Sequence, residues 1–321
     1  MPLVSIQNLK TFIEPISGTE PPIKAVDGVS LEIEPAQTLA LIGESGCGKT
    51  MLALSIGRLL PPGGRIVEGR IVFQQTDLTQ LPEQQLRNFR GRKIAYIFQD
   101  SMTALNPVMS VREQLLETIQ LHRKLTGRAA FDLSMELLRQ VRIPDCKRRL
   151  SQYPHELSGG LRQRVMIAIA LSGKPDLLIA DEPTTALDVT TQAEILSLLN
   201  ELQSSLGMAI LLITHDLLAV APASDWSAVM YAGRIVEVCL TPDLYKNPIH
   251  PYTQALLACM PRVGKGRQSF KAIPGTVPDL RFIPPGCPFH PRCPEAVSQC
   301  KQEEPLLEGV GPKHWVSCWR R

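Results

Sequence analysis

The eight residues at positions 43–50, Gly-Glu-Ser-Gly-Cys-Gly-Lys-Thr, constrain the fold more than any other part of the chain. They follow the apolar run Thr38–Ile42, which predicts a buried strand, and they lead into a helical pattern from Lys49 to Leu60. Glycines at this spacing let backbone N–H groups curl around phosphates at a helix N-terminus. The sequence therefore predicts a strand–loop–helix unit that binds a phosphorylated ligand. The predicted contacts are Gly43, Glu44, Ser45, Gly46, Cys47, Gly48, Lys49, which adds charge, and Thr50, which can ligate Mg²⁺.

Three further apolar runs predict buried strands, at Lys93–Phe98, Leu177–Ala180 and Ala209–Ile213. Each is short and is followed by a polar loop, as in parallel strands joined by crossover helices. The long stretch between the first two of these runs reads as helical, so we expect a helical insertion there. The pattern predicts an α/β fold built on a parallel sheet.

Short sequence patterns predict where several helices and strands begin or end. Ser110 and Glu113 fit a capping box, as do Thr191 and Glu194, and Gly207 is a plausible stop for the helix that follows the second box. The stretch around Ala232 and Gly233 predicts a hairpin turn.

Two adjacent carboxylates end the third predicted strand. Asp181 is placed to hold Mg²⁺ through water, and Glu182 to stand beside the phosphate that is attacked. Acidic pairs at strand ends are common and often only solvate a loop. Together with the phosphate loop, they predict phosphoryl-transfer chemistry.

A second anion site is predicted at Ser158, Gly159 and Gly160, where a hydroxyl residue and two glycines begin an amphipathic helix. One chain with two anion sites can use both on one nucleotide. Alternatively, it can bind a second nucleotide that another subunit presents.

These motifs, with the runs 181–188 and 213–216, resemble the ABC ATPase family across roughly residues 3 to 240. The resemblance implies a P-loop ABC ATPase core, with a RecA-like parallel sheet, a β-subdomain and a helical subdomain at about residues 100–165. It also implies ATP and Mg²⁺ as cofactors. In this family two subunits pair head to tail, so that each ATP lies between the phosphate loop of one subunit and the LSGGQ-type helix of the other.

The resemblance also implies roles for single residues. Gln99 resembles the Q-loop glutamine, which senses Mg²⁺ and the attacking water; His215 resembles the switch histidine, which contacts the γ-phosphate; and Asp188 resembles the D-loop aspartate. Phe12 is a candidate to stack on adenine. With Glu182, the residues Gln99 and His215 form the expected catalytic set. Taken singly, these residues also fit a surface amide, a histidine after a strand, a helix cap and a core aromatic.

Leu161 departs from the family pattern, because it stands where the LSGGQ motif has glutamine. The change removes a side-chain hydrogen bond to the nucleotide in the opposite site, while the backbone donors remain. We therefore expect weaker function only in the site that this helix completes.

The C-terminal region differs in composition, since 13 of the 27 prolines follow residue 240. This density predicts a Pro/Cys-rich irregular extension that is held by something other than a conventional core. Segments 247–257 and 286–296 resemble the C-terminal extension of oligopeptide and dipeptide importer ATPases. We predict a nucleotide-binding domain at 1–240 and this extension at 241–321.

Four of the eight cysteines, Cys287, Cys293, Cys300 and Cys318, crowd into this extension with spacings unlike the CxxC pairs of structural zinc sites. Four thiolates can hold a metal ion or a cluster. The resemblance to close relatives implies a 4Fe-4S cluster; zinc and free thiols are the alternatives. His290 and His314 are candidate substitute ligands.

The resemblance implies an ATP-hydrolysing importer subunit for dipeptides or oligopeptides at the cytoplasmic face of the inner membrane. Its expected partners are a second, paralogous ATPase subunit, two integral-membrane permease subunits and an extracytoplasmic peptide-binding protein. Importers of nickel, metallophores or glutathione have similar ATPases. The rival class, soluble ABC ATPases acting on ribosomes or DNA, usually carries two motif sets or a long coiled coil, and this sequence has neither feature. A net charge of +3 does not demand nucleic acid as a partner.

Overall fold

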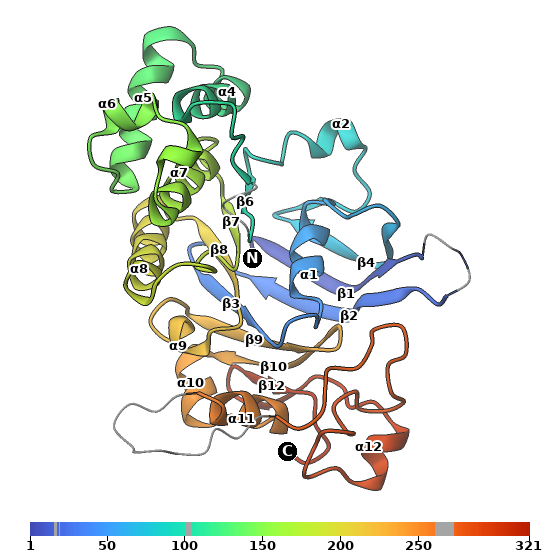
Figure 1. Cartoon of the computed structure of the whole chain (residues 1–321). Helices are drawn as coiled ribbons and strands as arrows, with labels where there is room; N and C mark the ends of the chain where they lie inside the picture. Colours follow the sequence, from blue (N-terminus) through green and yellow to red (C-terminus); the bar gives the residue numbers. More distant parts are fainter. Residues whose placement is uncertain (16–17, 19, 100–103, 261–272) are drawn as a thin grey trace. The chain divides into compact units, whose positions relative to one another are not determined.

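The computed structural model describes residues 1–15, 18, 20–99, 104–260 and 273–321 (Figure 1). The chain forms two compact units, each assembled from separate stretches of sequence. The first comprises Met1–Ile33, Leu39–Gln80 and Thr214–Arg321, and the second comprises Glu34–Thr38 and Leu81–Ile213. Among the described residues, no helix combines the length and the apolar composition needed to cross a membrane.

The first unit contains an antiparallel sheet with the strand order β2-β1-β4-β5. Its strands are β1 (Val4–Ile13), β2 (Ile23–Ile33), β4 (Gly64–Phe73) and β5 (Thr76–Asp77). Val4 lies opposite Ile33 on one side and Phe73 on the other, and all three are buried. The alternating apolar side chains of the central strand thus face a core, as expected for a sheet with one covered face.

The first unit also holds the phosphate-loop strand β3 (Thr38–Ile42) and the strands that extend from it. β3 pairs in parallel with β9 (Trp226–Tyr231), and β9 forms a hairpin with β10 (Arg234–Leu240). The predicted turn is confirmed, because Ala232 and Gly233 both have positive φ values, of 46° and 82°. Two strands from the end of the chain continue the sheet beyond β10: β12 (His314–Val316) and β11 (Glu308–Gly311).

Helix α1 (Lys49–Ile56) follows the loop as predicted but is shorter than the pattern suggested. The prediction that it continues to Leu60 was wrong. The helix ends at Gly57, and Arg58 adopts a left-handed φ of 51°, so the Leu59 amide bonds back to the Leu54 carbonyl. Apolar periodicity extends past this turn, which is why it gave the wrong end.

The C-terminal region folds into short elements that join a hydrophobic core. Its helices are α10 (Thr241–Lys246), α11 (Pro251–Ala258) and α12 (Ser298–Gln302), and α9 (Leu217–Val220) precedes β9. Tyr252 and Phe289, both almost fully buried, share one cluster with Ile42, Val229 and Tyr231. The expectation that the extension lacks a conventional core was therefore wrong: proline density predicted the irregular path but not the aromatic side chains that anchor it.

The second unit carries the parallel strands β6 (Ile94–Ile97), β7 (Leu177–Asp181) and β8 (Ala209–Thr214). β7 pairs with both neighbours, and its residues are all buried. The predicted helical insertion is confirmed, with its helices gathered together in Figure 1. They are α4 (Val111–Arg123), α5 (Gly127–Gln140), α6 (Cys146–Leu150), the 3-10 turn Pro154–Glu156 and α7 (Gly159–Leu171). The unit also holds α2 (Glu83–Leu86) and α8 (Val189–Leu206).

One of the two predicted capping boxes is present. Ser110 and Glu113 cap α4 reciprocally, as predicted. The box at Thr191 was wrong: α8 starts three residues earlier, where Asp188 accepts the Thr191 amide, and Glu194 instead pairs with Arg164 on α7 at 2.8 Å. A carboxylate at position 188 makes an equally good cap, so the local pattern could not decide between them. The predicted stop is confirmed at Gly207, which has a left-handed φ of 65°.

Candidate functional site

The predicted phosphate loop connects β3 to α1 and is shaped by close backbone packing. Gly48 caps α1 with a φ of 107°, a conformation that a residue with a side chain rarely adopts. A Cβ at Gly48 would overlap the Ala25 carbonyl, and one at Gly43 would overlap the Met230 carbonyl. Only glycine fits at these two positions, which explains the spacing seen in the sequence.

Lys49 folds back over the loop that precedes it. Its Nζ donates to the carbonyls of Gly43 at 2.8 Å and Glu44 at 2.9 Å, and the residue is 5% exposed. Burial raises the pKa of the Cys47 thiol, so that side chain stays neutral inside the loop. Ser45, Gly46 and Thr50 are exposed. The loop therefore combines an exposed stretch at a helix N-terminus with a lysine folded against it, an arrangement that suits phosphate binding.

The hairpin β9–β10 supports this loop from the same unit. The Gly233 amide donates to the Cys47 carbonyl at 2.8 Å, and the Asp27 amide donates to the Gly233 carbonyl at 2.9 Å. Two residues of the C-terminal region, Tyr252 and Arg292, bond to Glu44. Sequence reasoning missed both residues, and no local pattern signals them.

Two other predicted residues lie in the first unit. Phe12 is half-buried on β1, opposite Arg65 of β4. His215 is exposed and directly follows β8, and the next residue, Asp216, caps α9 by accepting the Leu218 amide at 2.9 Å. Their proposed contacts with adenine and the γ-phosphate stay predictions.

In the second unit, two separately predicted residues meet. Gln99, just after β6, donates from Nε2 to a carboxylate oxygen of Glu182 at 2.8 Å, and the Thr185 hydroxyl donates to the same oxygen at 2.9 Å. Glu182 directly follows Asp181 and takes a left-handed φ of 47°. Such backbone strain is concentrated at functional sites. The two hydrogen bonds fix one carboxylate oxygen, and Asp181 lies buried at the end of β7.

The predicted second anion site is the start of α7. Ser158 caps the helix by accepting the Leu161 amide at 3.4 Å. A Cβ on Gly160 would lie 2.8 Å from the Thr191 methyl, so the start of α7 packs against the first turn of α8. Hydrogen bonds from Thr191 hold the pKa of Asp188 below its usual range. Asp188 is thus the N-terminal cap of α8.

The four C-terminal cysteines line one cavity, together with His290 and Glu295. None forms a disulfide. Burial, and then the three other thiols, raises the pKa of Cys287 to about 11. His290 Nδ1 forms a hydrogen bond of 2.9 Å with the Cys287 carbonyl.

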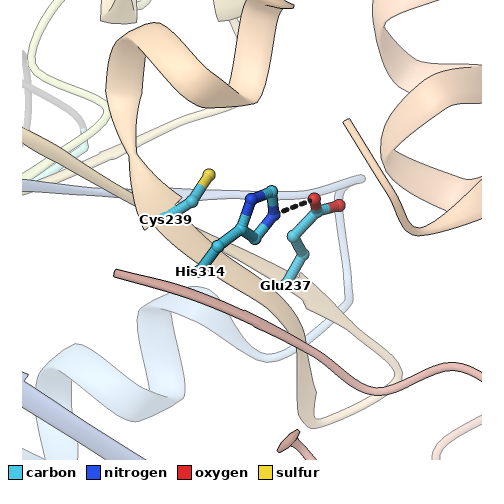
Figure 2. A group of neighbouring side chains, drawn as sticks. All are labelled: Glu237, Cys239 and His314. Carbon is cyan, nitrogen blue, oxygen red and sulfur yellow. Dashed lines mark hydrogen bonds and ion pairs between the residues drawn. The ribbon is translucent and has the colours of Figure 1, made fainter. Parts of the chain in front are cut away.

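Glu237, Cys239 and His314 form a separate buried group, drawn in Figure 2, whose ligand atoms all lie within 4.8 Å of one another. The Glu237 carboxylate accepts the amides of Ile249 and His250 and pairs with His314 Nε2 at 2.7 Å. These hydrogen bonds satisfy the buried carboxyl group, as buried polar groups require. His314 therefore belongs to this junction between β10, β12 and the start of α11. It does not line the cavity of the four cysteines, so the prediction that it could replace one of them as a ligand was wrong.

Comparison with known proteins shows the family to which the chain belongs. The family model described as ABC transporter matches residues 26–185, and the model described as oligopeptide/dipeptide transporter, C-terminal region, matches residues 236–300. The chain is 46% identical to the dipeptide transport ATP-binding protein DppD of Bacillus subtilis, over 99% of this chain and 94% of that protein. It is 44% identical to the oligopeptide transport ATP-binding protein OppD of Escherichia coli, over 95% of this chain and 90% of that protein.

Among solved structures, a dimeric post-hydrolysis state of an ATP-binding cassette with ADP and phosphate superimposes with a TM-score of 0.66 and 26% identity. The superposition covers 74% of this chain and 98% of that one. It supports the predicted fold class, an α/β P-loop core of the ABC ATPase type. The chain belongs to the ABC transporter ATP-binding proteins, in the family that carries the oligopeptide/dipeptide transporter C-terminal region.

Proposed function

We propose that this chain binds and hydrolyses ATP as one subunit of an importer of dipeptides or oligopeptides. The observation that carries the proposal is the loop at 43–50, where tightly packed glycines and the buried Lys49 form a phosphate cradle at the start of α1. The names of the similar proteins, transport ATP-binding proteins for dipeptides and oligopeptides, support the cargo.

In the proposed mechanism, Thr50, Asp181 and Gln99 would hold Mg²⁺, and the bound ion would supply positive charge beside the transferring phosphate. Glu182 orients and polarises the attacking water, and the hydrogen bond from Gln99 holds its carboxylate in place. Phe12 stacks on adenine and His215 contacts the γ-phosphate. Ser158, Gly159 and Gly160 bind the nucleotide held by a second subunit, and Asp188 communicates across that pair.

Glu182→Gln tests the assignment of the catalytic carboxylate. We expect turnover to fall by roughly 10² to 10⁴, because the general base is lost, while ATP binding persists. Glu201→Gln is a matched control, because Glu201 also lies in the second unit and forms an ion pair, with Arg142. Near-normal turnover in Glu182→Gln, or an equal loss in the control, would refute the role.

The partners we propose are a paralogous ATPase subunit, two integral-membrane permeases and an extracytoplasmic peptide-binding protein, with this chain at the cytoplasmic face of the inner membrane. Importers of nickel, metallophores or glutathione are the alternative. Co-purifying the membrane complex and identifying the ligand on its binding protein by mass spectrometry separates these cargoes. A metal complex or glutathione in place of a peptide would reject the proposed one.

For the extension at 241–321, set off from the nucleotide-binding domain at 1–240, we propose a 4Fe-4S cluster on Cys287, Cys293, Cys300 and Cys318. Its support is the common cavity that the four thiols line, because four thiolates together can hold a cluster or a metal ion. Anaerobic protein should contain iron and sulfide and absorb visible light, and Cys293→Ser should lose these signals while Cys259→Ser keeps them. Zinc without sulfide would reject the cluster.

A further inference from the structure

The C-terminal region reaches the phosphate loop through one arginine. Arg292 donates from its two terminal nitrogens to the two carboxylate oxygens of Glu44, at 2.7 and 3.0 Å. The arginine side chain is 5% exposed, and that of Glu44 is 28% exposed. A two-point pair between planar groups fixes orientation as well as distance.

The remaining contacts of Arg292 hold it in this orientation. Its Nε donates to the Pro274 carbonyl at 2.8 Å, and its guanidinium lies 5.8 Å from the centre of the Tyr231 ring. Hydrogen bonds to Glu44 raise the pKa of Arg292 further above its ordinary value. Arg292 also sits directly before Cys293, so the fold of the cysteine-rich segment determines where the arginine lies.

A second contact comes from helix α11. The Glu44 amide donates to the hydroxyl of Tyr252 at 2.9 Å. The Tyr252 ring is fully buried and packs against Tyr231 and Phe289, with centroid distances of 4.6 and 5.3 Å. Because the Tyr252 ring is packed on two sides, its hydroxyl is a rigid acceptor for the hydrogen bond from the Glu44 amide.

Every polar group of Glu44 is therefore engaged. Its amide bonds to Tyr252, its carboxylate to Arg292 and its carbonyl to Lys49, the residue that carries the charge of the loop. Two of these three partners come from the C-terminal region. A shift of Arg292 or Tyr252 would change the backbone path between Gly43 and Ser45, where the phosphate cradle begins.

We propose that Arg292 and Tyr252 are positioning residues that set the affinity of this chain for ATP by fixing Glu44 in the phosphate loop. The cysteine-rich extension thereby controls nucleotide binding in its own subunit. This inference rests on the proposed ATP binding, and it names the C-terminal extension as the part of the chain that sets the affinity.

The test is titration of the purified full chain with methylanthraniloyl-ATP and Mg²⁺. Arg292→Ala should weaken binding about 10-fold or more, since it leaves Glu44 without its charged partner. Arg292→Lys should recover part of the loss, because it keeps the charge but not the two-point geometry. Arg281→Ala is the matched control: this arginine also lies in the extension and pairs with two carboxylates, Asp279 and Glu20, but it does not contact Glu44. It should bind within about twofold of the wild type.

Tyr252→Phe keeps the ring and removes only the hydroxyl, so it tests the idea even if Arg292→Ala fails to fold. We expect its dissociation constant to rise about threefold, with unchanged far-ultraviolet circular dichroism. In the assembled transporter, both variants should raise KM for ATP and leave kcat near the wild-type value. A purely structural role would instead lower the folded fraction without changing KM.

A double-mutant cycle identifies the route of the effect. If Arg292 acts through Glu44, the variant Glu44→Ala with Arg292→Ala should bind no more weakly than Glu44→Ala alone. Additive losses, or wild-type affinity in folded Arg292→Ala and Tyr252→Phe, would overturn the inference. Absence of nucleotide binding by the wild-type chain would instead defeat the proposed function, so the two failures are distinguishable.

Discussion

The two helix starts at which the sequence predicts anion binding, those of α1 and α7, are built differently. At α1 the cap is Gly48, whose missing side chain leaves room for the Ala25 carbonyl, and Lys49 lies buried across the loop. At α7 the cap is the exposed Ser158, and a Cβ on Gly160 would meet the side chain of Thr191 rather than backbone. The first site is shaped by rigid main chain, the second by side chains that can adjust.

The two helix starts also differ in which parts of the molecule surround them. The loop before α1 receives bonds from the hairpin and from the C-terminal region of its own unit, so its shape is set within one chain. The start of α7 offers a hydroxyl and two glycines on an exposed or half-exposed surface. That arrangement suits the proposed role of α7, in which its ligand arrives with another subunit.

Substitution of Gly48 should give the largest effect. Gly48→Ala combines a forbidden φ with a backbone overlap, so we expect the free energy of unfolding to fall by about 3 kcal/mol or more and ATP binding to be lost. Gly160→Ala meets only a movable side chain and should cost about 1 kcal/mol. Denaturant titration measures both. Equal losses would break the contrast between rigid and adjustable helix starts.

Removing the loop charge should come second. Lys49→Ala should raise the dissociation constant for ATP about 10- to 100-fold, since hydrogen bonds to charged groups contribute about 1.5 to 3 kcal/mol. The exposed Lys24 of the same unit is the control, and Lys24→Ala should leave binding unchanged. Calorimetry on the single subunit measures both, and unchanged binding by Lys49→Ala would contradict a phosphate contact.

The cap of α7 should matter mainly in the assembled transporter. Ser158→Ala should cost about 1 kcal/mol of stability and leave ATP binding by the single chain intact, while ATPase turnover of the complex falls. Ser110→Ala removes an equivalent cap in the same unit and should leave turnover unchanged. If both variants lower turnover equally, Ser158 is only a helix cap.

Leu161→Gln should give the smallest effect and sharpen the comparison most. It restores the side-chain donor of the family motif, so nucleotide affinity in the site completed by α7 should rise a few-fold, the value of about one hydrogen bond. The affinity of this chain's own loop should not change. Site-resolved binding in the complex, with Lys49→Ala silencing the loop of this chain, separates the two.

Much of this architecture could be predicted because its causes are local. A buried run predicts β3, β7 or β8, a serine three residues before a glutamate predicts the start of α4, and the phosphate pattern predicts its loop. The contacts of Glu44 could not be predicted. Its partners Tyr252 and Arg292 are 208 and 248 residues away, and no periodicity or spacing links positions so distant. The end of α1 was missed because apolar periodicity continues past the turn at Arg58, and the cap of α8 was missed because Asp188 and Thr191 both fit a helix cap.

The pairing of Glu237 with His314 has a consequence for biosynthesis. These residues are separated by 77 positions, and the carboxylate on β10 is fully buried once β12 is in place. During translation, β10 leaves the ribosome well before the histidine that hydrogen-bonds to its carboxyl group, and long-range pairing of this kind slows folding. Until His314 is synthesised, the Glu237 carboxyl group has only the amides of Ile249 and His250 as donors, so we expect β12 to complete this junction after β10 and α11 have formed.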